Sequence, residues 1–226
     1  MATDERARPP ARYGLLLVTL IAAYLVAAVT DTRSGGAIHV AFVAAIGLLA
    51  VRHTRPWPWP AWLAAGAALA TAVAAGAGAT SGSKPAEGAA DIWNGLLLLA
   101  TVVIIVGRVL RLEQVTAQSI YGALSAYLLI GLMFASWFGA IGFLASAPFF
   151  TGGQPANAET VQYFSFTTLT TLGYGDFTAG GSLGRALAVL EAIAGQVFLA
   201  TLVARLVSAY GTSRRQPPGD LLLIVT

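Results

Sequence analysis

Residues 167–177 read TTLTTLGYGDF and lie between two long apolar segments of the chain. This stretch is too polar to span a membrane and too apolar for an ordinary surface loop. Its two glycines, Gly173 and Gly175, stand at alternate positions, and glycine adopts left-handed backbone conformations that a Cβ disfavours. We therefore expect a backbone in which successive carbonyl oxygens face the same side.

The composition around this stretch is that of an integral membrane protein. The chain has 226 residues, of which 57% are hydrophobic and 10% charged, whereas a soluble domain carries roughly 25% charged residues. There is no cysteine, and the two histidines, His39 and His53, lie apart in sequence, which argues against disulfides and metal clusters. Scattered basic residues argue against a nucleic-acid partner. No nucleophile–base pattern suggests an enzyme or an organic cofactor.

Apolar runs predict an all-α membrane protein with six transmembrane helices, since about 20 apolar residues span the hydrocarbon core. The predicted spans are residues 13–29, 37–51, 61–79, 92–110, 117–144 and 182–210. The second is short, and the third is rich in alanine and glycine. A cleaved signal peptide is an alternative for the first, although Asp4 and Glu5 favour a retained helix.

The charges give the orientation of these spans, because short cytoplasmic loops are enriched in Lys and Arg. With the N-terminus inside, ten of the 13 basic residues are cytoplasmic, and Arg33, Lys84 and Arg185 are outside. We therefore expect a multi-pass protein of the cell membrane, with lipid around it and both termini in the cytoplasm.

The segment between the last two spans has to leave the membrane and return. Residues 145–158 have the composition of an extracellular loop. Asn157 is a candidate N-cap with Glu159 in the first turn, and a helix from there to Thr170 would be roughly 18 Å long. Such a half-membrane helix followed by irregular backbone is tolerated only where it is buried in protein or lines a wet cavity, so we expect a re-entrant pore helix and loop.

Residues 171–176, TLGYGD, resemble the selectivity-filter signature of potassium channels. The resemblance is to potassium channels with six spans and one pore domain per subunit. It is to bacterial ion channels with a two-span pore module, and the sensor-like domain of this chain would be atypical because it is poor in charges. It implies a homotetramer in which four chains surround an axis and rings of oxygen replace the hydration shell of K⁺. The ion ligands would be the carbonyls of Thr171, Leu172, Gly173 and Tyr174 with the Thr171 hydroxyl. Leu172 stands where valine is commoner, and we expect selectivity to survive because only its carbonyl faces the ion.

Further residues are candidates for supporting this filter. Gly175 and Asp176 complete the signature. Tyr163 stands where related channels often place a tryptophan that bonds the filter aspartate, so its hydroxyl is a candidate partner of Asp176. Plain packing of Tyr163 is the alternative. Thr167 stands where some bacterial channels carry a glutamate that pairs with this aspartate, so that second contact is expected to be missing.

The last span carries the candidate gate and cavity residues. Residues 192–195, AIAG, are similar to the inner helix of voltage-gated potassium channels, with Gly195 either a hinge or a site of close packing. Gln196 is a candidate to line the cavity. Glu191 is the acidic residue of this span, and such a group is a functional candidate. It is held by pore-helix threonines, raises cation density near the cavity, or is a structural carboxyl.

The expected organisation is a cytoplasmic segment (1–12), a four-helix sensor-like domain (13–112), a pore domain (113–210) and a short tail (211–226). The pore domain holds helix 5, a pore helix (158–170), the filter (171–176) and helix 6. Arg108 and Arg111 are the basic residues of the fourth span, both at its cytoplasmic end, so we expect weak or no voltage dependence. The tail is too short for a domain that binds a small-molecule ligand. A non-conducting accessory protein and a less selective cation channel are the alternatives.

Overall fold

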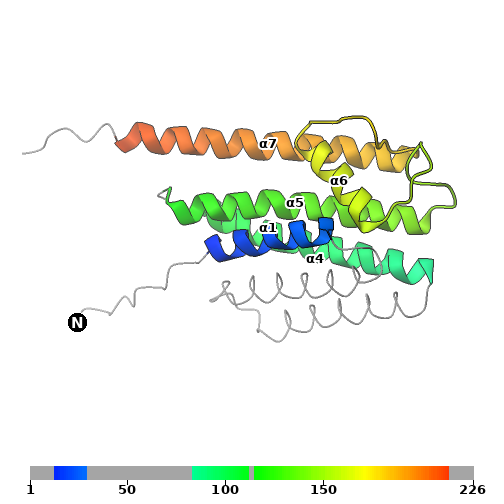
Figure 1. The fold of residues 1–226 in the computed structure, drawn as a ribbon. Helices are drawn as coiled ribbons and strands as arrows, with labels where there is room; N and C mark the ends of the chain where they lie inside the picture. Colours follow the sequence, from blue (N-terminus) through cyan, green and yellow to red (C-terminus); the bar gives the residue numbers. More distant parts are fainter. Residues whose placement is uncertain (1–12, 30–82, 112–114, 214–226) are drawn as a thin grey trace, which may run out of the picture.

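The computed structural model describes residues 13–29, 83–111 and 115–213, and the structural statements below refer to those residues. They form helices joined by loops, with one isolated bridge between extended residues (Figure 1). The helices are α1 (Tyr13–Val29), α4 (Lys84–Arg111), α5 (Ala117–Leu144), α6 (Ala158–Leu169) and α7 (Ser182–Ser213). The spans predicted over 37–51 and 61–79 lie outside the described residues, so the count of six spans stays a prediction.

Three of the described helices are long and apolar enough to cross a membrane. They are Lys84–Leu110 within α4, Ala117–Leu144, and Ser182–Ser208 within α7. The predicted ranges 13–29 and 117–144 coincide with α1 and α5. The all-helical class expected from the apolar runs is therefore confirmed for the described part of the chain.

Helix α4 begins earlier than the sequence prediction of residue 92. The Ser83 carbonyl accepts hydrogen bonds from the backbone N–H groups of Ala86 and Glu87, at 3.0 and 3.1 Å, which starts the helix at Lys84. Pro85 fits the first turn, where its missing N–H is not needed, and Glu87 lies near the positive end of the helix dipole. The prediction was wrong because these residues are polar, and apolar content alone does not mark where a helix begins.

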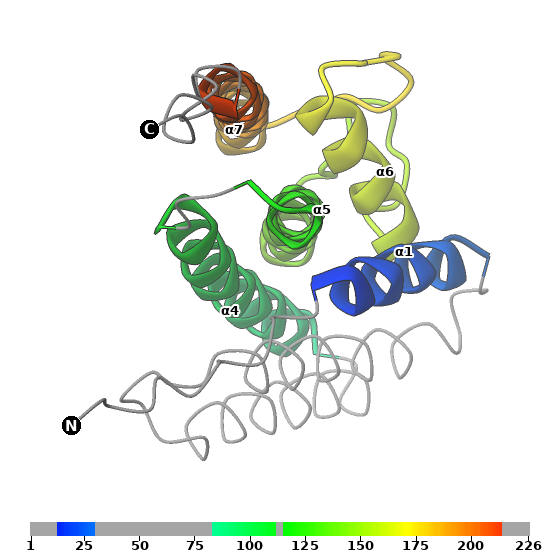
Figure 2. The same cartoon turned by 90° about the vertical axis from the view of Figure 1, so that its left-hand side faces the viewer.

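Helix α5 lies at the centre of the described helices, in contact with α1, α4, α6 and α7 (Figure 2). It begins with a capping box, in which the Ser119 hydroxyl accepts the Thr116 N–H at 2.9 Å and the Thr116 hydroxyl accepts the Ser119 N–H at 3.3 Å. Small residues let neighbours approach it closely. A Cβ at Gly131, for example, would lie 2.8 Å from the Phe166 ring of α6. Helix α5 therefore forms the surface on which α6 and α7 are positioned.

The chain between α5 and α7 turns back on itself. Helix α6 runs from the end of α5 toward the middle of α7, and the following segment returns to the end where α7 begins (Figure 1). The loop before α6 and the segment before α7 pair through their backbones at this end. The Thr151 N–H donates to the Thr178 carbonyl at 2.9 Å, and the Gly180 N–H donates to the Phe149 carbonyl at 2.8 Å. The segment after the TLGYGD signature is therefore tied to the loop before α6.

A cluster of aromatic rings fixes the same end of the molecule. Its members come from α5, the loop before α6, α6 itself and the segment after the signature: Phe138, Phe149, Phe150, Phe164, Tyr163 and Phe177. The ring centroids of Phe138 and Phe164 are 5.0 Å apart, as are those of Phe150 and Phe177. Each such pair contributes about 0.5–1.5 kcal/mol beyond its buried area, so the cluster holds the loops against α5 and α6.

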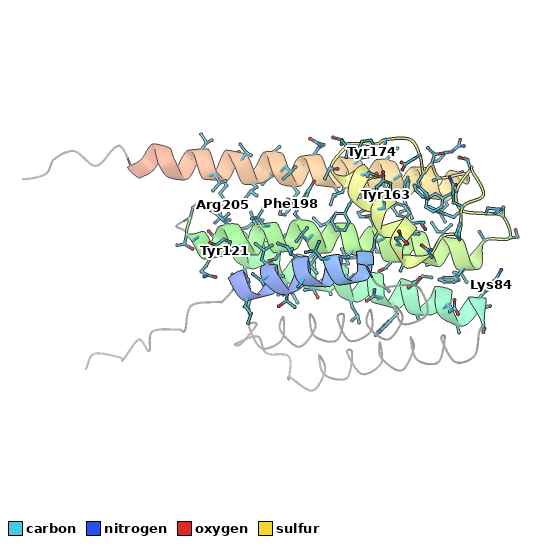
Figure 3. The ribbon with its side chains drawn as sticks, viewed as in Figure 1. Lys84, Tyr121, Tyr163, Tyr174, Phe198 and Arg205 are labelled. Atoms are coloured by element: carbon cyan, nitrogen blue, oxygen red, sulfur yellow. The ribbon has the colours of Figure 1, made fainter. Side chains whose placement is uncertain are left out.

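Helix α7 continues unbroken through Gly195 and ends at Ser213, slightly beyond the predicted residue 210. One side faces α5 and α6, and Figure 3 shows Phe198 and Arg205 on that side. The Phe198 ring lies 5.8 Å from that of Tyr127 in α5, and the Arg205 guanidinium donates to the Val109 carbonyl of α4. The other side is apolar and exposed in the single chain; it carries Leu183, Val189, Leu190, Ile193, Val197, Val203 and Val207.

Candidate functional site

Helix α6 begins as the sequence predicts. The Asn157 side chain accepts a hydrogen bond from the Thr160 N–H at 2.9 Å, which makes Asn157 the N-cap, and Glu159 lies in the first turn. The helix ends at Leu169, one residue before the predicted Thr170, which serves as the C-cap. Because the chain reverses direction here, the end of α6 decides where the TLGYGD segment starts.

The end of α6 is a Schellman motif with threonine in the position that is usually glycine. The Leu172 N–H bonds to the Thr167 carbonyl at 2.8 Å, and the Thr171 N–H bonds to the Thr168 carbonyl at 2.9 Å. This geometry requires a left-handed residue directly after the C-cap Thr170, and that residue is Thr171, with φ = 58°. A β-branched residue in this region is a rare and strained conformation. The strain occurs at the first residue of the proposed filter.

Left-handed residues alternate through the segment. Thr171, Gly173 and Gly175 have φ values of 58°, 51° and 83°. The sequence predicted this conformation for the two glycines and missed Thr171. A backbone that alternates in this way turns successive carbonyl oxygens toward one side, which is the arrangement needed to present them to one ligand.

The carbonyl oxygens of this segment are free in the single chain. Among the described residues, those of Thr171, Leu172, Gly173 and Tyr174 accept no hydrogen bond. The side chains are exposed as well, with Leu172 at 55% and Tyr174 at 68% of their full accessible area. Figure 3 shows Tyr174 in the loop beside α7. An exposed row of carbonyls next to an exposed leucine and tyrosine is available for contact with a ligand or with another chain.

Asp176, the last residue of the TLGYGD segment, has neighbours on two sides. The nearby Asp176 side chain is the main cause that raises the pKa of the Tyr163 hydroxyl above its ordinary value. The Gln154 amide donates to the Asp176 carbonyl at 3.2 Å. The structure therefore places Tyr163 near Asp176, and their role in supporting a filter stays a prediction.

Thr167 supports the segment through its backbone and not through its side chain. Its hydroxyl donates to the Phe164 carbonyl at 3.0 Å, within α6. Its carbonyl accepts the N–H groups of Leu172 and Gly173, at 2.8 and 3.1 Å. The described hydrogen bonds of Thr167 therefore connect the segment to α6.

Two α7 residues contact the junction between α6 and the TLGYGD segment. The Gln196 amide donates to the Thr171 hydroxyl at 3.3 Å. A Cβ at Gly195 would overlap the Leu169 carbonyl oxygen and lie 2.9 Å from the Leu169 Cδ1. The same Leu169 carbonyl accepts the Tyr127 hydroxyl of α5 at 3.2 Å. Gly195 therefore permits close packing here, which is one of the two roles considered from the sequence.

Glu191 of α7 packs against α6 and is fully buried, with 0% of its surface exposed. Its Oε1 shares a short hydrogen bond with the Ser165 hydroxyl, and Ser165 also bonds to the Gly131 carbonyl of α5 at 2.7 Å. The sequence suggested pore-helix threonines as possible partners. The observed partner is a serine, which the sequence analysis did not single out because a lone serine in a helix carries no distinctive signal.

Together these features describe a helical membrane protein with a buried polar network behind a loop of exposed, unpaired carbonyls. Residues 130–211 match a family model described as "Ion channel". The match covers a little over a third of the chain, from the middle of α5 to near the end of α7. It supports ion transport across a membrane as the function. The searches of curated proteins and of solved structures found no match.

Proposed function

We propose that this chain is a potassium-selective channel that conducts K⁺ passively across the plasma membrane as a homotetramer, with weak or no voltage dependence. The carbonyls of Thr171, Leu172, Gly173 and Tyr174, with the Thr171 hydroxyl, are the proposed ion ligands. The observation that carries the proposal is the alternating left-handed backbone of Thr171, Gly173 and Gly175, with carbonyls that accept no hydrogen bond within the described chain.

The need for four copies follows from the geometry of one. A single chain supplies one row of carbonyls, whereas replacing the hydration shell of a cation takes oxygen atoms on all sides. The exposed Leu172 and Tyr174 side chains support a partner at this place. The exposed apolar side of α7 fits contact with lipid or with another copy.

Helix α6 favours a cation at the same place. Its C-terminal end leads directly into Thr171, and the C-terminus of a helix carries a partial negative charge. The Asn157 cap and Glu159 lie at the opposite, N-terminal end. In a tetramer, four such helix ends would point toward the axis and lower the cost of a partly dehydrated cation.

The first test is ion flux into liposomes that contain the purified protein. We expect K⁺ uptake to exceed Na⁺ uptake and to be blocked by Ba²⁺. Gly173→Ala should abolish the K⁺-selective flux, because alanine at φ = 51° is strained by about 1–2 kcal/mol in each chain. A Cβ there meets no atom within 4 Å in the single chain, so the change does not disturb packing within the chain.

Gly107→Ala is the matched control. Gly107 also has open space around it, but it lies inside α4 and its φ is not positive. The control should conduct like the unaltered protein. Unchanged selectivity in Gly173→Ala would contradict the filter assignment. A folded tetramer without flux would favour the accessory protein, and equal K⁺ and Na⁺ flux would favour the less selective cation channel.

A further inference from the structure

The network behind α6 joins three helices through two side chains. Glu191 of α7 bonds to Ser165 of α6, and Ser165 bonds to the Gly131 carbonyl of α5. Glu191 and Ser165 are both fully buried. The Glu191 Oε2 has no hydrogen-bond partner in the described residues.

Counting hydrogens in this network assigns the proton of Glu191. The Gly131 carbonyl can only accept, so the hydrogen in its bond with Ser165 comes from the Ser165 hydroxyl, which has one hydrogen. The hydrogen in the second bond must then come from Glu191. Glu191 satisfies both bonds only as a neutral carboxylic acid that donates to Ser165.

The surroundings support the neutral form. Tyr127 of α5 is the titratable group close enough to interact with Glu191 electrostatically. Among the described residues of α5, α6 and α7, no basic side chain pairs with it. A buried carboxylate without a cation is far more costly than a buried acid with one unpaired oxygen.

The network lies one helical turn before the end of α6, which leads into the proposed filter. Ser165 is one helical turn before Leu169, whose carbonyl contacts Gly195 and Tyr127. The filter segment starts two residues after Leu169. A displacement of α6 at Ser165 would therefore move the first filter residue.

We propose that Glu191 is a positioning residue which, as a neutral acid, donates a hydrogen bond to Ser165 and so fixes α6 and the attached filter between α5 and α7. This inference rests on the proposed potassium-channel function. It makes the filter sensitive to pH in a defined direction. Alkaline pH that removes the Glu191 proton leaves the single Ser165 hydrogen to serve two acceptors, so that one of the two bonds is lost and the filter loosens, whereas acidic pH leaves the network intact.

The variants at Glu191 and Ser165 test the proposal in the liposome assay. Glu191→Gln keeps a neutral donor and should retain the K⁺ over Na⁺ preference at neutral pH. Glu191→Ala and Ser165→Ala each leave a buried group without its partner, and should lower this preference about tenfold. The unaltered channel should lose flux at alkaline pH, while Glu191→Gln should not. Glu159→Gln, which neutralises an exposed carboxylate of α6, is the control and should keep the alkaline loss.

An infrared spectrum tests the protonation without any flux. The difference between the unaltered protein and Glu191→Gln at neutral pH should contain the C=O stretch of a protonated carboxylic acid. A carboxylate band there, or a Glu191→Gln variant as impaired as Glu191→Ala, would overturn the proposal. If the unaltered protein carries no K⁺, the channel proposal fails, and the infrared result still decides the state of Glu191.

Discussion

Thr171 combines a strained backbone with a hydroxyl that glycine lacks. Its φ of 58° is the conformation that a Schellman motif normally assigns to glycine. An L-residue in the left-handed region costs about 1–2 kcal/mol. The Thr171 hydroxyl accepts the Gln196 amide and donates to the Thr170 carbonyl. A strained residue is typical of a functional site, and the proposed role of the hydroxyl as an ion ligand would give a reason for threonine here.

A comparison of Thr171→Gly with Thr170→Gly isolates this strain. Both threonine hydroxyls donate to a nearby carbonyl, at 2.6 Å for Thr171 and 2.7 Å for Thr170. Thr170 has a right-handed backbone, with φ = −80° and ψ = −5°, where glycine loses about 1 kcal/mol. We expect Thr171→Gly to be more stable than Thr170→Gly by about 1–2 kcal/mol. Thermal unfolding midpoints of the purified protein in detergent would show the difference, and equal midpoints would contradict the strain at Thr171.

Gly195 shows how α7 is fitted to α6 along their contact. Glu191, Gly195 and Gln196 lie on the side of α7 that meets α6, where they contact Ser165, Leu169 and Thr171 in the same order. Gly195 allows the α7 backbone to approach the Leu169 carbonyl. The helix is continuous there, so close packing accounts for the glycine in this conformation.

Gly195→Ala distinguishes packing from flexibility by the sign of its effect. If the glycine only provided flexibility, alanine inside a helix would stabilise the protein by about 1 kcal/mol. Because a Cβ would overlap the Leu169 carbonyl, we expect instead a loss of about 1–3 kcal/mol. Gly107→Ala, in open space within α4, is the control that should show the gain. The measurement is again the unfolding midpoint, and a rise in Gly195→Ala would favour the hinge.

The helices differ in how well the sequence predicted them. The ends of α5 were predicted correctly because its apolar run coincides with the helix. The start of α4 was missed because its first turns are polar. The partner of Glu191 was not predictable, since Ser165 lies 26 residues away and the contact depends on the register between α6 and α7. The left-handed backbone at Gly173 and Gly175 was predictable because glycine spacing is local to the sequence, whereas the left-handed Thr171 depends on the end of α6.

Among the described helices, α4 is connected to α6 and α7 mainly through α5. Helix α4 packs along α5, and the Val109 carbonyl near its end accepts a hydrogen bond from Arg205 of α7. A basic side chain at a helix C-terminus interacts favourably with the helix dipole. If a stimulus moved α4, the movement would therefore reach α7 through the Arg205–Val109 hydrogen bond and through α5.

Voltage is a weak stimulus for α4 because its charges are badly placed. Its arginines, Arg108 and Arg111, stand in its last turn, and Lys84 stands at its start. A charge that crosses the whole field gains about 2.3 kcal/mol per 100 mV, and effective sensors move three to four charges in each subunit. Charges at a helix end cross little of the field. We therefore expect the double variant Arg108→Gln, Arg111→Gln to leave the conductance–voltage curve nearly unchanged in patches from liposomes. Lys84→Gln, at the start of α4, is the control and should also leave the curve unchanged. A steep curve in the unaltered channel that flattens only in the arginine variant would show that α4 senses voltage after all.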